Sequence, residues 1–265
     1  MAELALKQAT IEYQEFGPQD SAHPPVFFVH GVLVNGELWR GVAEELARRG
    51  YRCIVPTLPL GSHTIPVKDA GVLSLLGVAG IVNDAIAALD LSDVTLVGSD
   101  TGGGICQLAV DASSDRIGRL VLTNCDAFDQ CPPFPFDVVF TLLRGPISIK
   151  ALMGPMRLAA LRNSALGFGL LISRPDKRLT ADWIAPCLND ARICRDLAAL
   201  LRQIATTLAA HNCNIEVALI DTEGEIAIDV FYLTIGGAKL DQETQTQLQA
   251  ALSLAVEELR PTPAT

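Results

Sequence analysis

The chain has 265 residues, of which 49% are hydrophobic and 19% charged, so it can form a large core and is not expected to be disordered. Its net charge of −10 argues against nucleic acid as a partner, because phosphate contacts need clustered lysine and arginine. The most apolar stretch, residues 70–88, is broken by glycine, asparagine and aspartate, which argues against a membrane-spanning helix and a membrane partner.

Seven cysteines are present, an odd number without a C-x-x-C pair. This pattern argues against a disulfide framework and against a zinc site, and no other metal site is predicted. Residues 1–10 lack the apolar stretch of a secretory signal. We therefore expect free thiols and a cytoplasmic location.

Strands and a helix are predicted in the first part of the chain. Residues 6–16 alternate apolar and polar side chains, as in a strand that is exposed on one face. Residues 26–29 are continuously apolar, which is typical of a strand buried on both faces of a sheet. Residues 39–48 have apolar side chains at helical spacing, and residues 52–55 give the next strand.

The same alternation continues along the chain. A helix is predicted over residues 70–90, a strand at 94–97, and another strand at 119–123 after a second helix. This alternation predicts an α/β fold with a doubly wound, mostly parallel sheet. Ligands of such sheets bind at the carboxyl ends of the strands, where His30, Asp100 and Asp126 are expected.

A glycine-flanked turn follows the strand at 94–97. Asp100 stands at its apex, with Gly98 two residues before it and Gly102 and Gly103 after it. This spacing is typical of a strand–nucleophile–helix turn, because larger side chains would collide with the strand or the helix. The alternative is an ordinary tight turn in which Asp100 caps the following helix.

Together with the sequence VFFVHG at residues 26–31, this turn resembles the α/β-hydrolase family, over about residues 6–203. The haloalkane-dehalogenase and epoxide-hydrolase branch of that family has an aspartate at the apex. The resemblance implies a hydrolase that attacks carbon in a small apolar substrate through Asp100, forms a covalent ester and uses no cofactor.

The resemblance also implies further site residues. The backbone N–H groups of Val32 and Thr101 are expected to stabilise an oxyanion, and His30 and Gly31 to shape the loop that carries Val32. Trp39 is included among the candidate substrate-binding residues. A structural role for His30 is the alternative to a part in proton transfer.

The predicted domains are a hydrolase core at residues 1–130, a helical cap at 131–196 and a third segment at 197–265. In the family, a histidine after the last strand, oriented by a carboxylate, activates the water that breaks the ester. The four histidines, at positions 23, 30, 63 and 211, do not follow a last strand. Asp126 is the candidate orienting acid, or else a loop residue, and we expect turnover to be impaired unless His211 enters the site.

The third segment is predicted as an α-β-β-α unit, with a first helix at 197–210, strands at 214–220 and 226–233, and a last helix at 242–258. Residues 212–216 and 228–232 resemble the ACT regulatory domain, in particular the C-terminal copy in bacterial PII uridylyltransferases. The opening strand and the ligand loop of that domain are absent. The hairpin could extend the hydrolase sheet or form a homodimer, so the alternative function is a non-catalytic fusion for oligomerisation or small-molecule sensing.

Overall fold

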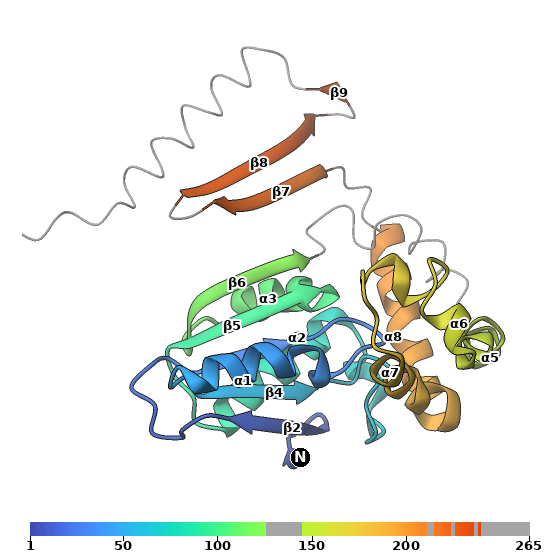
Figure 1. Ribbon diagram of the computed structural model, residues 1–265, viewed down its shortest axis with the longest axis horizontal. Coiled ribbons are helices and arrows are strands. Elements are labelled where there is room, and N and C mark those ends of the chain that lie inside the picture. Colours follow the sequence, from blue (N-terminus) through green and yellow to red (C-terminus); the bar gives the residue numbers. More distant parts are fainter. Residues whose placement is uncertain (126–144, 211–214, 224–225, 236–237, 240–265) are drawn as a thin grey trace, which may run out of the picture. The chain divides into compact units, whose positions relative to one another are not determined.

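The computed structural model describes residues 1–125, 145–210, 215–223, 226–235 and 238–239 (Figure 1). The chain divides into a first unit, Met1–Ala127 with Cys131–His211, and a second unit, Phe128–Gln130 with Asn212–Thr265. Each unit is described by itself.

A six-stranded sheet forms the centre of the first unit, in the order β1-β2-β4-β3-β5-β6. Four neighbouring strands are parallel, whereas β1 and β2 pair antiparallel at one edge, as expected of a mostly parallel sheet. The strands are β1 (Ala2–Ala5), β2 (Thr10–Phe16), β3 (Val26–Val29), β4 (Cys53–Thr57), β5 (Val94–Asp100) and β6 (Ile117–Cys125).

Helices cover both faces of this sheet because the central strands are apolar on both sides. In β3, Val26 and Phe28 pack in a cluster with Ala43 of α1 (Arg40–Arg48). Phe27 and Val29 point to the opposite face, where α2 (Leu75–Ala88) and α3 (Thr101–Ala112) contribute to the larger core cluster. Figure 1 shows α1 on one side of the sheet and α2 with α3 on the other.

Short 3-10 helices modify two predicted helices. The first predicted helix is preceded by η1 (Gly36–Trp39), which Asn35 caps by accepting a hydrogen bond from the Glu37 N–H at 3.1 Å. The predicted helix at 70–90 is divided into η2 (Ala70–Val72) and α2, and Ser74 caps α2.

A group of helices follows residue 144: α5 (Pro146–Met153), η4 (Gly154–Arg157), α6 (Ala159–Arg162), η5 (Phe168–Leu170), α7 (Lys177–Asn189) and α8 (Ala191–Ala210). The buried Arg162 ties several of them together. Its guanidinium donates to the Thr180 hydroxyl and to the backbone oxygens of Met156, Arg157 and Lys177, at 2.9 to 3.1 Å. A buried charge is tolerated when it is hydrogen-bonded in this way.

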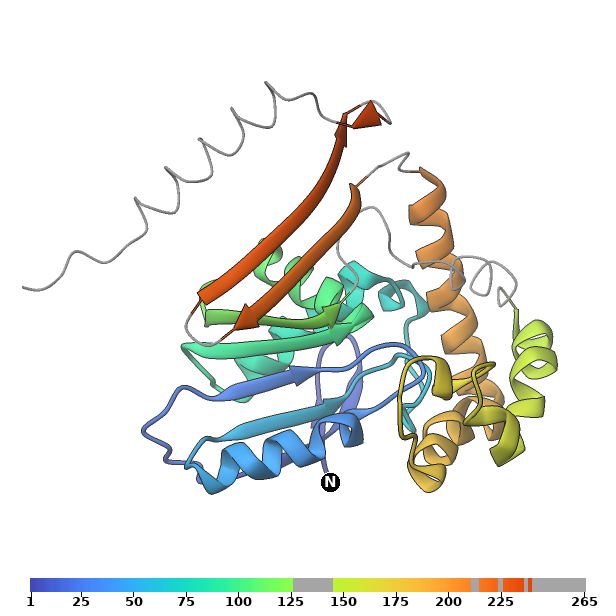
Figure 2. The same cartoon turned by 45° about the horizontal axis from the view of Figure 1, so that its top comes forward.

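Helix α8 begins before the predicted third segment. It starts at Ala191, and Ile193, Leu197 and Leu201 are buried in the core of the first unit. The first residues of the segment predicted at 197–265 therefore belong to the unit that contains the six-stranded sheet. Figure 2 shows α8 as one continuous helix.

In the second unit, β7 (Ile215–Glu223) and β8 (Ile226–Ile235) pair antiparallel, and β9 (Ala238–Lys239) adds to β8. The two predicted strands are thus present. This hairpin alone does not support the resemblance to an ACT domain. His211, residues 212–214 and the predicted helix at 242–258 lie outside the described residues. In the part of the chain that is described, no helix is long and apolar enough to cross a membrane.

Candidate active site

Strand β5 passes into α3 through a strained residue. Asp100 has φ 56° and ψ −140°, a conformation that costs free energy in a residue other than glycine. Leu33 (φ 61°), in the loop after β3, and Asn124 (φ 39°), near the end of β6, also have positive φ, as do Asp90 and Asp93 in the turn before β5. Strain of this kind is characteristic of functional sites.

The glycines around Asp100 are required by close packing. A Cβ atom at Gly98 would lie 2.7 Å from the Cys106 Sγ, and one at Gly103 would lie 2.1 Å from the Cys125 Cβ. A Cβ atom at Gly102 would lie 2.6 Å from the Val29 carbonyl oxygen. These contacts support the steric argument made from the spacing of the small residues.

The carboxylate of Asp100 lies over the loop that follows β3. A Cβ atom at Gly31 would lie 2.0 Å from Asp100 Oδ2, so the two residues are in direct contact through the bare glycine backbone. Asp100 is exposed, and its side chain makes no capping hydrogen bond to α3, all of whose residues are described. The alternative that Asp100 caps this helix is therefore wrong.

His30 supports this loop from within the core. Its side chain is fully buried; Nδ1 lies 2.9 Å from the Gly31 oxygen, and the Leu58 N–H donates to Nε2 at 2.8 Å. Burial lowers the pKa of His30 to about 4. The hydrogen bond to the Gly31 oxygen raises this pKa, but by less than burial lowers it. The neutral ring thus donates through Nδ1 and accepts through Nε2, which agrees with a structural role.

Val32, Thr101 and Trp39 are all buried. Gly31 and Asp100 are in contact, as described above. Val32 follows Gly31 in the chain, and Thr101, the first residue of α3, follows Asp100. Trp39 packs against Phe28 at a ring distance of 5.0 Å, in the cluster between the sheet and α1. The structure therefore places Trp39 in the core.

The described histidines lie in three different places. His23 stacks on Tyr51 and precedes β3, so it lies at the amino end of the parallel strands, opposite to Asp100. His63 accepts from the Gly61 N–H through Nδ1, and its Nε2 is 3.3 Å from Asp196 of α8. Both ring nitrogens of His30 and of His63 are thus engaged in the protein.

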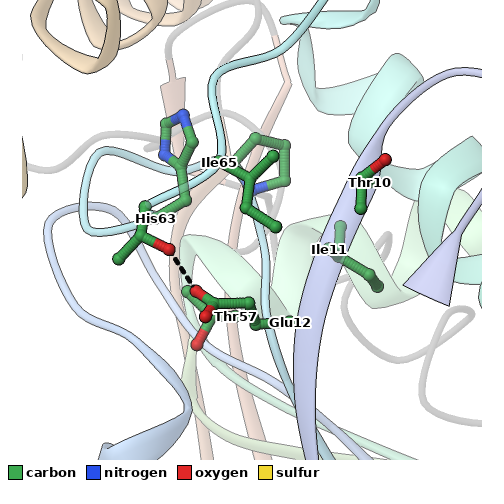
Figure 3. A pocket seen from close by; sticks show the side chains of 8 residues that line it. Thr10, Ile11, Glu12, Thr57, His63 and Ile65 are labelled. Carbon is green, nitrogen blue, oxygen red and sulfur yellow. Dashed lines mark hydrogen bonds between the residues drawn. The ribbon is translucent and has the colours of Figure 1, made fainter. Parts of the chain in front are cut away.

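A small pocket lies beside His63, between β2 and the segment that follows β4 (Figure 3). The Thr64 hydroxyl donates to Glu12 across it. Thr10, Ile11, Thr57 and Ile65 also line it. The pocket is too narrow to hold a substrate and does not include Asp100.

Asp126 and the first part of the predicted cap, residues 131–144, lie outside the described residues. The end of β6 is described, and Cys125 stands opposite Asp100 in the strand register. The chain that leads to Asp126 therefore reaches the same edge of the sheet as the turn.

Asn35 has a role that was not predicted from the sequence. Besides capping η1, its Oδ1 accepts a hydrogen bond at 3.0 Å from Nε1 of the buried Trp183 in α7. This bond joins the loop after β3 to the helices that follow residue 144. An asparagine just before a helix start is a capping signal, but its bond to Trp183 has no sequence signature.

Comparison with known proteins agrees with this architecture. Residues 24–146 match the family model described as alpha/beta hydrolase fold. The uncharacterized protein Mb2734 of Mycobacterium bovis is 26% identical over 218 residues, covering 80% of this chain and 58% of the relative. This chain therefore spans less than two thirds of the length of that relative.

Two solved structures show the fold. An epoxide hydrolase from Vigna radiata, VrEH1, superposes with a TM-score of 0.61 at 16% identity, over 79% of this chain and 73% of the other. A putative ancestral haloalkane dehalogenase, AncHLD2, superposes with a TM-score of 0.57 at 17% identity, over 79% of this chain and 75% of the other. At these identities the likeness concerns the fold alone.

Proposed function

Because the chain has the α/β-hydrolase fold, we propose that it is a hydrolase that acts on a small apolar molecule with Asp100 as the nucleophile. The conformation of Asp100 supports this proposal: an exposed carboxylate at a strained turn, in contact with Gly31. An aspartate in this position needs no general base to attack carbon.

The proposed reaction begins with displacement at carbon. A carboxylate oxygen of Asp100 forms a bond to the electrophilic carbon, the bond from that carbon to the leaving group breaks, and its electron pair goes with the leaving group. Water then attacks the ester carbonyl, and the backbone N–H groups of Val32 and Thr101 stabilise the oxyanion. The bond between the carbonyl carbon and the alkyl oxygen then breaks, one proton of the water goes to that oxygen and the other to solvent. The products are an alcohol (a diol from an epoxide) and the regenerated carboxylate.

The second step is expected to be slow. The ring nitrogens of His30 and His63 are engaged by backbone groups and by Asp196, so neither histidine is available to activate water. Asp126 keeps its proposed role as an orienting acid. Unless His211, which lies outside the described residues, activates the water, an ester that forms on Asp100 should therefore persist long enough to be isolated.

Epoxides and haloalkanes are the substrate classes to test first. They are the substrates given in the names of the two structurally similar proteins, and both present an electrophilic carbon that an ionised carboxylate can attack without a general base.

Intact-protein mass spectrometry tests the proposal. After incubation with styrene oxide or 1-bromobutane, we expect one covalent adduct per chain, mapped to Asp100 by peptide sequencing. The Asp100→Asn variant should form none. Asp111→Asn, which changes an exposed acid on the helix after the turn, should react like the parent. An unmodified parent chain with both reagents would refute the proposal.

Association through the second unit is a second candidate function. Its described part is a β7–β8 hairpin with the short β9, and a sheet of this size needs a further surface for independent stability. A second copy of the chain would supply one. Light scattering should give a dimer mass for the full chain and a monomer mass for a chain that ends at His211; equal states would contradict this candidate.

A further inference from the structure

A cavity of about 570 Å³ lies on the first unit, away from the strained turn. Its walls come from α8, from the start of α5 and from the segment between β4 and η2. No residue of the turn or of the loop at 30–33 lines it. The lining residues are Pro66, Val67, Lys68, Ala70, Pro146, Arg192, Arg195, Asp196, Ala198, Ala199 and Arg202. Its volume is within the range of small-molecule sites.

The cavity is strongly cationic although the chain carries a net charge of −10. Arg195 and Arg202 lie seven residues apart on α8, on one face of the helix, and Lys68 lies across from them. Lys68 and Arg195 are exposed and form no ion pair with any residue that the structure describes. A bound anion would therefore gain charge contacts without breaking an existing pair at either residue.

The one acidic residue of the lining is already engaged. Asp196 Oδ2 accepts a hydrogen bond from the Val67 N–H at 2.9 Å and lies 3.3 Å from His63 Nε2. Arg192 is paired with Asp190 at 2.8 Å, outside the lining. The lining therefore holds four basic residues, one of them paired with Asp190, against the single carboxylate of Asp196, and so keeps an excess of positive charge.

The remaining wall is apolar and consists of proline, valine and alanine side chains. A fully hydrated inorganic ion would leave this surface unused, whereas an apolar body would cover it. We propose that the cavity binds a small organic anion, with a carboxylate or phosphate group at Lys68 and Arg195 and an aliphatic or aromatic body against the apolar wall. This binding is separate from the reaction proposed at Asp100.

Isothermal titration of the full chain with hexanoate and with hexyl phosphate tests the proposal, and 1-hexanol is the neutral control. We expect at least one anion to bind, with an affinity that falls as salt rises. Hexanol should bind at least about tenfold more weakly, a difference of about 1.4 kcal/mol. The two anions distinguish a carboxylate site from a phosphate site.

The double variant Lys68→Gln with Arg195→Gln should lose about tenfold in affinity for the anion that binds. Arg178→Gln, which removes an exposed arginine from α7, should bind like the parent, as should Asp100→Asn. Neither anion binding at millimolar concentration, equal binding of hexanol, or an unchanged double variant would overturn the proposal. Unchanged melting temperatures would show that the variants are folded.

Discussion

At the scale of single residues, the site depends on the absence of a side chain at Gly31. A Cβ atom there would lie 2.0 Å from Asp100 Oδ2, so Gly31→Ala forces the carboxylate to move. A displacement of about 1 Å in a reacting group lowers its rate about 100-fold. We expect Gly31→Ala to form the Asp100 adduct about 100-fold more slowly, measured by mass spectrometry over time.

Gly41→Ala is the matched control for this substitution. A Cβ atom at Gly41 in α1 would meet no atom within 4 Å, so it should leave the rate unchanged and stabilise the helix by up to about 1 kcal/mol. If Gly31→Ala reacts as fast as Gly41→Ala, the contact between Gly31 and Asp100 does not position the nucleophile.

The residues at the turn were predictable because their spacing has a steric cause. Gly98, Gly102 and Gly103 are small since each is in close contact with a neighbouring atom, and this requirement is visible in the sequence. The burial of Trp39 was not visible. An aromatic residue at the start of a helix has the same sequence pattern whether it packs on Phe28 or faces a ligand.

At the scale of elements, the central strands were predicted nearly to their ends because a strand buried on both faces is continuously apolar. The start of α8 was misplaced. Arg192 and Arg195 interrupt the apolar pattern near Ala191, and only the tertiary contacts of Ile193 and Cys194 with the core reveal the first turns of this helix. Contacts between distant segments cannot be read from local periodicity.

One such contact joins α8 to the segment after β4. Asp196 accepts from the Val67 N–H and lies beside His63 Nε2, and Asp196 and His63 are both buried. Removal of the Asp196 carboxylate would leave the Val67 N–H and His63 Nε2 without this partner, which should lower the free energy of unfolding by about 1 to 3 kcal/mol.

We therefore expect Asp196→Ala to lower the free energy of unfolding by that amount in urea titrations. Asp182→Ala, which changes an exposed acid on α7, should stay within about 0.5 kcal/mol of the parent. Equal stabilities of the two variants would show that the contact between α8 and this segment does not stabilise the fold.

At the scale of the whole molecule, the site and the cavity draw on residues far apart in the sequence. The turn joins the carboxyl ends of β3, β5 and β6, and this could be expected from the alternation of strands and helices. The cationic cavity could not be predicted from the sequence, because Lys68 and Arg195 are brought together only when α8 packs beside the segment after β4. The net charge of −10 predicted an acidic chain and gave no indication of a cationic cavity.

The stability of the first unit should depend on pH through His30. Its pKa is about 4 in the folded chain and near 6.5 when unfolded, so the unfolded chain binds the proton more tightly. The contribution of His30 is therefore fully present above pH 6.5 and is lost as pH falls toward 4. The loss between pH 6.5 and 5, where most carboxylates remain ionised, should be about 1.5 kcal/mol.

Urea titrations at several pH values measure this loss. His23→Gln changes an exposed histidine and should retain the pH dependence of the parent, whereas His30→Gln should lose it, because Gln does not titrate. The substitution of His30 itself should lower the free energy of unfolding by the same amount at every pH, so this loss can be told apart from the pH dependence. A parent chain with the same free energy of unfolding at pH 6.5 and at pH 5 would contradict the assignment of His30 as a neutral, buried support of the loop beside Asp100.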